Sequence, residues 1–138
     1  MRRRLTIAAI AILIAYWGFM FFATHTTSLN QSRLLEHGDK FAHFAAYAVL
    51  AWLLAMVLRG LDVPLRRACL IVVVVGAAYA AIDEWLQQFT RRHADFYDWL
   101  ADVIGIGFGL IVVCLTHNMV RGFIHRLMER RKRSRTGL

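Results

Sequence analysis

Residues 39–58, with the sequence DKFAHFAAYAVLAWLLAMVL, contain the pattern that decides the fold. From Phe41 to Leu58 the chain runs for 18 residues without a charged side chain. A helix needs about 20 residues to cross the hydrocarbon core of a bilayer, because each residue advances it by about 1.5 Å. We therefore predict a transmembrane helix whose polar residues lie in its first turns.

Three more apolar runs of similar length accompany it, at 5–23, about 68–89 and about 96–116. Backbone groups inside a bilayer must satisfy their hydrogen bonds internally, so these runs are predicted to be helices. The expected fold is an all-α, polytopic membrane protein, a four-transmembrane-helix bundle. It forms one membrane domain, residues 1–138, with a basic tail at 118–138.

The first run follows three arginines and resembles a secretory signal. Its 19 residues exceed a typical signal core, and no clean cleavage site follows it. We predict that it is an uncleaved first helix.

The connections differ in basic charge. The N-terminus, the loop 59–67 and the tail after His117 hold thirteen of the seventeen Lys and Arg residues, and the opposite side holds four. Lys and Arg are retained on the cytoplasmic side of membrane proteins. Both termini are therefore predicted to be cytoplasmic (N-in/C-in), with the protein in the inner, cytoplasmic membrane.

Polar residues recur at helical spacing at the predicted outer end of three spans. Asp39, His43 and Tyr47 are four residues apart and share one helix face. Helix capping by Asp39 and snorkelling by Lys40 explain those two residues without a function, but not His43, one turn inside the apolar run.

The ends of the third and fourth spans add carboxylates. Asp83, Glu84, Gln87 and Gln88 lie near the end of the third run, where we expect Glu84 to point inward. In the fourth run Asp98 and Asp102 precede Gly105 and Gly109 on one face, and glycines four apart allow a close helix contact. Asp102 is thus expected to be buried, and either paired with a cation such as His43 or Arg92 or protonated.

We expect a site at this end, because ionisable residues at membrane depth are costly and usually functional. In an enzyme, His43 and Glu84 are the candidate catalytic residues, His43 as general acid or base. The candidate substrate-binding residues are Asp39, Lys40, Tyr47, Gln87, Arg92, Asp98 and Asp102. Oxygen ligands from Asp98 and Asp102 are weak grounds for a divalent cation, so no metal or other cofactor is expected.

These stretches resemble the VanZ-like family of small membrane proteins. The resemblance rests on Asp39-Lys40-x-x-His43-Phe44-x-x-Tyr47, on Glu84-x-x-Gln87, and on Arg92, Asp98, Gly105 and Gly109. The family usually has Asn where this chain has Asp102. The resemblance implies a helical membrane domain and a link to tolerance of the glycopeptide teicoplanin, although many relatives have no such link. It implies no particular biochemical activity.

Three functions fit this pattern. The first is an outer-leaflet site that binds or modifies an envelope lipid or a lipid-linked cell-wall intermediate, with Arg91 and Arg92 available for phosphate. The second is a non-catalytic accessory or scaffold protein whose polar cluster is a structural network. The third, an ion-coupled carrier, is disfavoured because the inner halves of the spans are apolar.

The remaining features suggest partners. The net charge of +8 comes with no nucleic-acid-binding motif, so nucleic acid is not expected. The basic tail, Arg121 to Arg135, is predicted to be an interfacial helix against anionic lipid. A homo-oligomer is compatible with the sequence. Cys69 and Cys114 form no CxxC pair and are expected to be packing residues.

Overall fold

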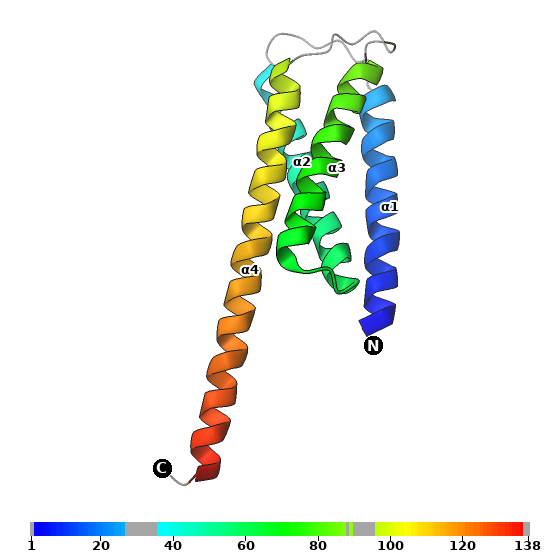
Figure 1. Cartoon of the computed structure of the whole chain (residues 1–138). Helices are drawn as coiled ribbons and strands as arrows, with labels where there is room; N and C mark the ends of the chain where they lie inside the picture. The colour runs from blue at the N-terminus through cyan, green and yellow to red at the C-terminus, as the bar shows by residue number, and fades with distance from the viewer. Residues whose placement is uncertain (1, 27–35, 88, 90–95, 137–138) are drawn as a thin grey trace.

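Four helices form the described part of the chain in a computed structural model (Figure 1). The structure describes residues 2–26, 36–87, 89 and 96–136. For some of these only the course of the backbone is described, namely residues 2, 24–26, 36–37, 39, 87, 120–121 and 124–136. The helices are α1 (Arg2–Thr26), α2 (Glu36–Gly60), α3 (Leu65–Gln87) and α4 (Phe96–Thr136). Each contains a stretch long and apolar enough to cross a membrane: Arg3–Ala23, Lys40–Gly60, Leu65–Leu86 and Phe96–Met119. The predicted all-α fold with four spans is confirmed.

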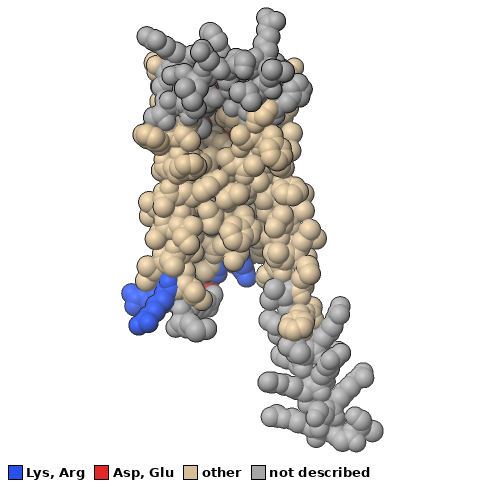
Figure 2. Space-filling model, turned by 180° about the vertical axis from the view of Figure 1, so that it is seen from behind, with Lys and Arg blue, Asp and Glu red and all other residues tan. Residues whose placement is uncertain are grey.

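The middle of the bundle has an apolar surface. Figure 2 shows one face on which the described side chains between the two ends include no Lys, Arg, Asp or Glu. Large apolar side chains such as Ile14, Val74 and Ile111 are exposed there. Soluble monomers rarely expose so much contiguous apolar surface, whereas lipid contact requires it.

Successive helices run antiparallel, so α2 and α4 are parallel to each other (Figure 1). We call the end at which α2 and α4 begin the polar end, and the opposite end the terminal end. Both chain termini lie toward the terminal end, where Figure 2 shows described Lys and Arg side chains. Which end faces the cytoplasm stays a prediction.

A tight turn joins α2 to α3 at the terminal end. The Leu61 amide donates to the Val57 carbonyl (3.0 Å), and the Arg59 side chain donates to the Val63 carbonyl (2.7 Å). Asp62 has a φ of 65°, in the left-handed region that aspartate tolerates better than most residues. Pro64, which has no amide hydrogen to donate, directly precedes α3.

The α2–α4 contact is the most extensive of the bundle. Gly105 and Gly109 face the backbone of α2 so closely that a Cβ on either would overlap a carbonyl oxygen, that of Phe44 or that of Ala48. Only glycine permits this approach, which allows two helices to pack backbone against backbone. The predicted close contact at these glycines is therefore present, and its partner is α2.

Helix α1 is the most peripheral of the four. Its buried large side chains are Leu13 and Met20, within the part of the helix whose side chains are described. The Tyr16 hydroxyl donates to the Ala46 carbonyl of α2 (2.9 Å), and Trp17 packs edge-on against Tyr79 of α3, with ring centroids 5.1 Å apart. These contacts attach α1 to the outside of the α2–α3–α4 group.

Helix α4 continues beyond its span. The span ends at Met119, close to the predicted end near 116, and the helix runs without a break through Thr136. The basic tail is therefore a continuation of α4, which projects beyond the other helices at the terminal end (Figure 1). An interfacial position, as predicted from its charge, would require a bend after the span.

The glycine contact leads to a test of the fold. Gly105→Ala and Gly109→Ala should each lower the free energy of unfolding by about 1–3 kcal/mol, because the added methyl group forces α2 and α4 apart. Unfolding is measured by far-UV circular dichroism during titration of detergent-solubilised protein with sodium dodecyl sulfate.

Gly107→Ala is the matched control, because nothing lies within 4 Å of a Cβ at that position. Alanine there should be neutral or stabilise α4 by up to about 1 kcal/mol through its higher helix propensity. Equal effects at all three glycines would show that α2 and α4 are not in backbone contact.

Candidate functional site

The buried ionisable side chains of the described residues all lie at the polar end. They are His43 from α2 (6% exposed), Asp83 and Glu84 from α3 (1% and 7%) and Asp102 from α4 (0%). Each lies within the first two or the last two turns of its span. Three helices thus contribute to one polar cluster.

A buried contact between His43 and Asp102 forms the centre of the cluster. The Nδ1 atom of His43 is 3.0 Å from Oδ1 of Asp102. When Nδ1 carries a proton it donates to this carboxylate, which leaves Nε2 with a lone pair in the neutral ring. A carboxylate that holds one ring nitrogen in this way fixes both the tautomer and the orientation of the imidazole. The predicted partnership of Asp102 with His43 is observed.

A second, more exposed pair lies nearer the end of the bundle. The Lys40 ammonium is 2.9 Å from Oδ1 of Asp98, with side-chain exposures of 41% and 13%. Lys40 also lies over the Tyr97 ring, 5.7 Å from its centroid. Asp98 is in the first turn of α4, where the helix dipole favours a negative charge. The parallel course of α2 and α4 aligns both pairs, with sequence separations of 58 and 59 residues.

Helix α3 brings carboxylates against these pairs. Three possible ligand atoms lie within 4.8 Å of one another, one from each of His43, Glu84 and Asp98. Asp83 is buried next to Glu84 in the sequence, so two adjacent acids of α3 both face the interior. Asp83 is not among the site residues that the sequence predicts. The pattern that could have identified it is its position as an acid inside a span.

Several buried polar atoms near the cluster have no hydrogen-bond partner among the residues that the structure describes. They are the Tyr47 hydroxyl, the Trp99 indole nitrogen and Oδ2 of Asp102. Most buried polar atoms in folded proteins are hydrogen-bonded, and a buried one that is not costs about 1–3 kcal/mol. The interior of the polar end therefore keeps hydrogen-bonding capacity that the described residues do not use.

Six of the nine predicted site residues have described side chains at this end: Lys40, His43, Tyr47, Glu84, Asp98 and Asp102. Asp39 and Gln87 belong to α2 and α3, but their side chains lie outside the described part, and Arg92 lies outside the described residues altogether. The catalytic and substrate-binding roles stay predictions.

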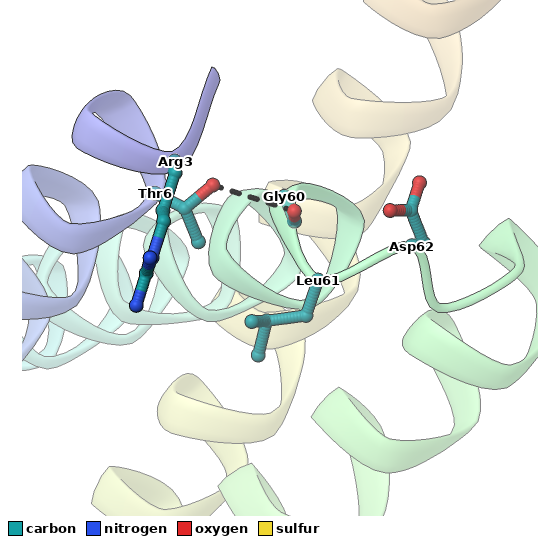
Figure 3. A pocket seen from close by; sticks show the side chains of 5 residues that line it. All are labelled: Arg3, Thr6, Gly60, Leu61 and Asp62. Carbon is teal, nitrogen blue, oxygen red and sulfur yellow. Dashed lines mark hydrogen bonds between the residues drawn. The ribbon is translucent and has the colours of Figure 1, made fainter. Parts of the chain in front are cut away.

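A cavity of about 460 Å³ lies at the opposite, terminal end. It is lined by Arg3, Thr6, Gly60, Leu61 and Asp62, and the Thr6 hydroxyl donates to the Gly60 carbonyl at 3.3 Å (Figure 3). Its lining has one acid, one base and one hydroxyl, and Arg3, Leu61 and Asp62 are exposed. The cavity is separate from the buried cluster and shares none of its residues.

Comparison with known proteins identifies the family to which this chain belongs. A search of the curated proteins and a search of the solved structures each found no significant match. A family model described as VanZ/LLP1 matches residues 6–117, which include the four spans almost entirely and every described residue of the polar cluster. This chain, a multi-pass membrane protein by its four spans, therefore belongs to the VanZ/LLP1 family.

Proposed function

We propose that the polar end binds the headgroup of an envelope lipid or of a lipid-linked cell-wall intermediate, in the outer leaflet of the inner membrane. The observation that carries this proposal is the stack of two polar pairs, Lys40–Asp98 above His43–Asp102, where α2 and α4 enter the membrane. A lipid presents its polar atoms at the same depth and its chains to the apolar surface below.

Lys40 is the residue most accessible to such a headgroup. Its side chain is 41% exposed, whereas the partner Asp98 is 13% exposed. A lysine ammonium has three donors, so it can contact a phosphate while it keeps the bond to Asp98. The outward orientation of this end rests on the distribution of Lys and Arg in the sequence.

The geometry also equips His43 for proton transfer. With Nδ1 held by Asp102, Nε2 is the nitrogen that would accept or deliver a proton, as in other sites where a carboxylate orients a histidine. Modification of the bound lipid would use this group, with Glu84 close by. A role in tolerance of the glycopeptide teicoplanin is supported only by the family resemblance.

A second candidate is the accessory role, in which the cluster is a structural network. The burial of the network favours this candidate, since Asp102 is 0% and His43 is 6% exposed. Buried polar contacts between membrane helices orient the helices whether or not a ligand binds. The two candidates differ in whether substitutions remove lipid from a protein that remains folded.

The lipid proposal predicts the result of native mass spectrometry on protein extracted gently from membranes. Wild type should retain a lipid, and Lys40→Ala should lose most of it, since a charge-assisted hydrogen bond is worth about 1.5–3 kcal/mol, or roughly a tenfold to hundredfold change in affinity. Arg66→Ala, which removes an exposed cation at the terminal end, is the matched control and should retain it.

Far-UV circular dichroism of each variant establishes that it is folded. Equal lipid occupancy in wild type, Lys40→Ala and Arg66→Ala would rule out headgroup binding through Lys40. It would favour the accessory role.

The network itself is tested by two double-mutant cycles on the free energy of unfolding. His43→Ala and Asp102→Ala should show a coupling energy of about 0.6–1.7 kcal/mol, the range for hydrogen bonds between membrane helices. Lys40→Ala and Asp98→Ala should couple by less than about 1 kcal/mol, because their pair is more exposed. Coupling energies indistinguishable from zero in the first cycle would contradict the buried contact.

A further inference from the structure

We infer that the polar end holds a divalent first-row transition-metal cation, bound by a ring nitrogen of His43 and one carboxylate oxygen each of Glu84 and Asp98. This inference does not depend on lipid binding. It starts from the convergence of three ligand residues from α2, α3 and α4, whose ligand atoms all lie within 4.8 Å of one another.

The spacing suits a metal site after small side-chain rotations. Ligand atoms that are each about 2.0–2.2 Å from one ion lie about 3–4 Å apart in tetrahedral or octahedral geometry. No separation between the three ligand atoms exceeds 4.8 Å, so none is more than about 2 Å wider than this spacing. The three helices already supply the directions from which the ligands approach.

The donor set indicates the kind of cation. An imidazole nitrogen suits Zn²⁺ and Fe²⁺ and carboxylate oxygens also suit Mn²⁺, whereas Ca²⁺ and Mg²⁺ are bound almost entirely by oxygen. Neither Cys69 nor Cys114 belongs to the group formed by His43, Glu84 and Asp98, so no thiolate ligand is assigned. A fourth position would be filled by water or by an oxygen of a bound molecule.

Asp102 provides the independent observation. It is 0% exposed, its Oδ1 is 3.0 Å from His43 Nδ1, and its Oδ2 has no hydrogen-bond partner among the described residues. Histidines that bind metals almost always donate their other ring N–H to a carboxylate or a carbonyl, which fixes the ring and strengthens the ligand. Asp102 is thus a positioning residue, and Nε2 of His43 is the nitrogen assigned to the cation.

Asp98 can contribute to this site while it stays paired with Lys40. Lys40 bonds to Oδ1 of Asp98, so Oδ2 is the oxygen assigned to the cation.

This assignment differs from the sequence-based expectation. The sequence indicated no metal, and its weak alternative used Asp98 and Asp102 as oxygen ligands. In the structure Asp98 converges instead with His43 and Glu84, while Asp102 contacts Nδ1 of His43.

The test uses the full chain in detergent, stripped with a chelator and then supplied with Zn²⁺ or Mn²⁺ alone. Elemental analysis after dialysis should find one ion per chain in wild type, and isothermal titration should give its affinity. Glu84→Gln and Asp98→Asn should each weaken binding more than about 100-fold, since each removes a ligand charge. Asp62→Asn and His117→Ala, at the terminal end, are the matched controls and should bind as wild type does.

Asp102→Asn separates positioning from ligation. It should retain one ion per chain with an affinity lowered about 10- to 100-fold, and Co²⁺ bound to it should keep the absorption bands of the wild-type coordination number. A purely structural role would leave the affinity of the folded variant unchanged.

Wild type without a stoichiometric ion would overturn the inference, whatever the variants do. Binding that persists unchanged in Asp98→Asn would do so as well, and this variant is suited to the test because Asp98 lies at the edge of the bundle. Circular dichroism confirms that each variant is folded before its affinity is compared.

Discussion

The close parallel contact between α2 and α4 determines the rest of this structure. At Gly105 and Gly109 the backbone of α4 lies against the carbonyl oxygens of Phe44 and Ala48. Helices in a bilayer gain nothing from the hydrophobic effect when they associate, because lipid is as apolar as they are. Close packing and hydrogen bonds must hold them together, and the glycines provide the close packing.

The polar pairs depend on that contact. A histidine on α2 and an aspartate on α4 can meet at 3.0 Å because the helices approach closely just below them, and the parallel course of the helices lets a second pair form at almost the same sequence separation. This pairing in turn stabilises the Asp102 carboxylate, which has no exposed surface, within a span. Helix α3 completes the enclosure with Asp83 and Glu84, and α1 contributes to it only from outside. The chemistry of the polar end therefore belongs to three helices.

Much of this arrangement can be predicted from the sequence, because it follows from local patterns. The four spans follow from apolar runs of bilayer length, and the glycine face of α4 follows from the spacing of Gly105 and Gly109. What cannot be predicted is which helix occupies that face. Residues on α2 and α4 are separated by a whole helix, and nothing local indicates that Phe44 and Ala48 are the partners.

The site was predictable to a similar extent. The depth of His43, Glu84 and Asp102 follows from their positions in the spans. Glu84 is buried, as its position predicts, and the adjacent Asp83 is buried as well. At the end of α3 the interior is bounded by α2 and α4 on different sides, so neighbouring residues of α3 can both be enclosed. Such enclosure depends on the assembled bundle and leaves no trace in local spacing.

The length of α4 has a mechanical consequence. Its 41 residues make a rod of about 60 Å, roughly twice the thickness of the hydrocarbon core. One end of that rod carries Asp98 and Asp102, and the other projects beyond the bundle. For a rod of this length, a tilt of about 5° about its polar end displaces the far tip by about 5 Å. A rigid α4 would therefore act as a lever that turns a small adjustment at one membrane surface into a larger movement beyond the other.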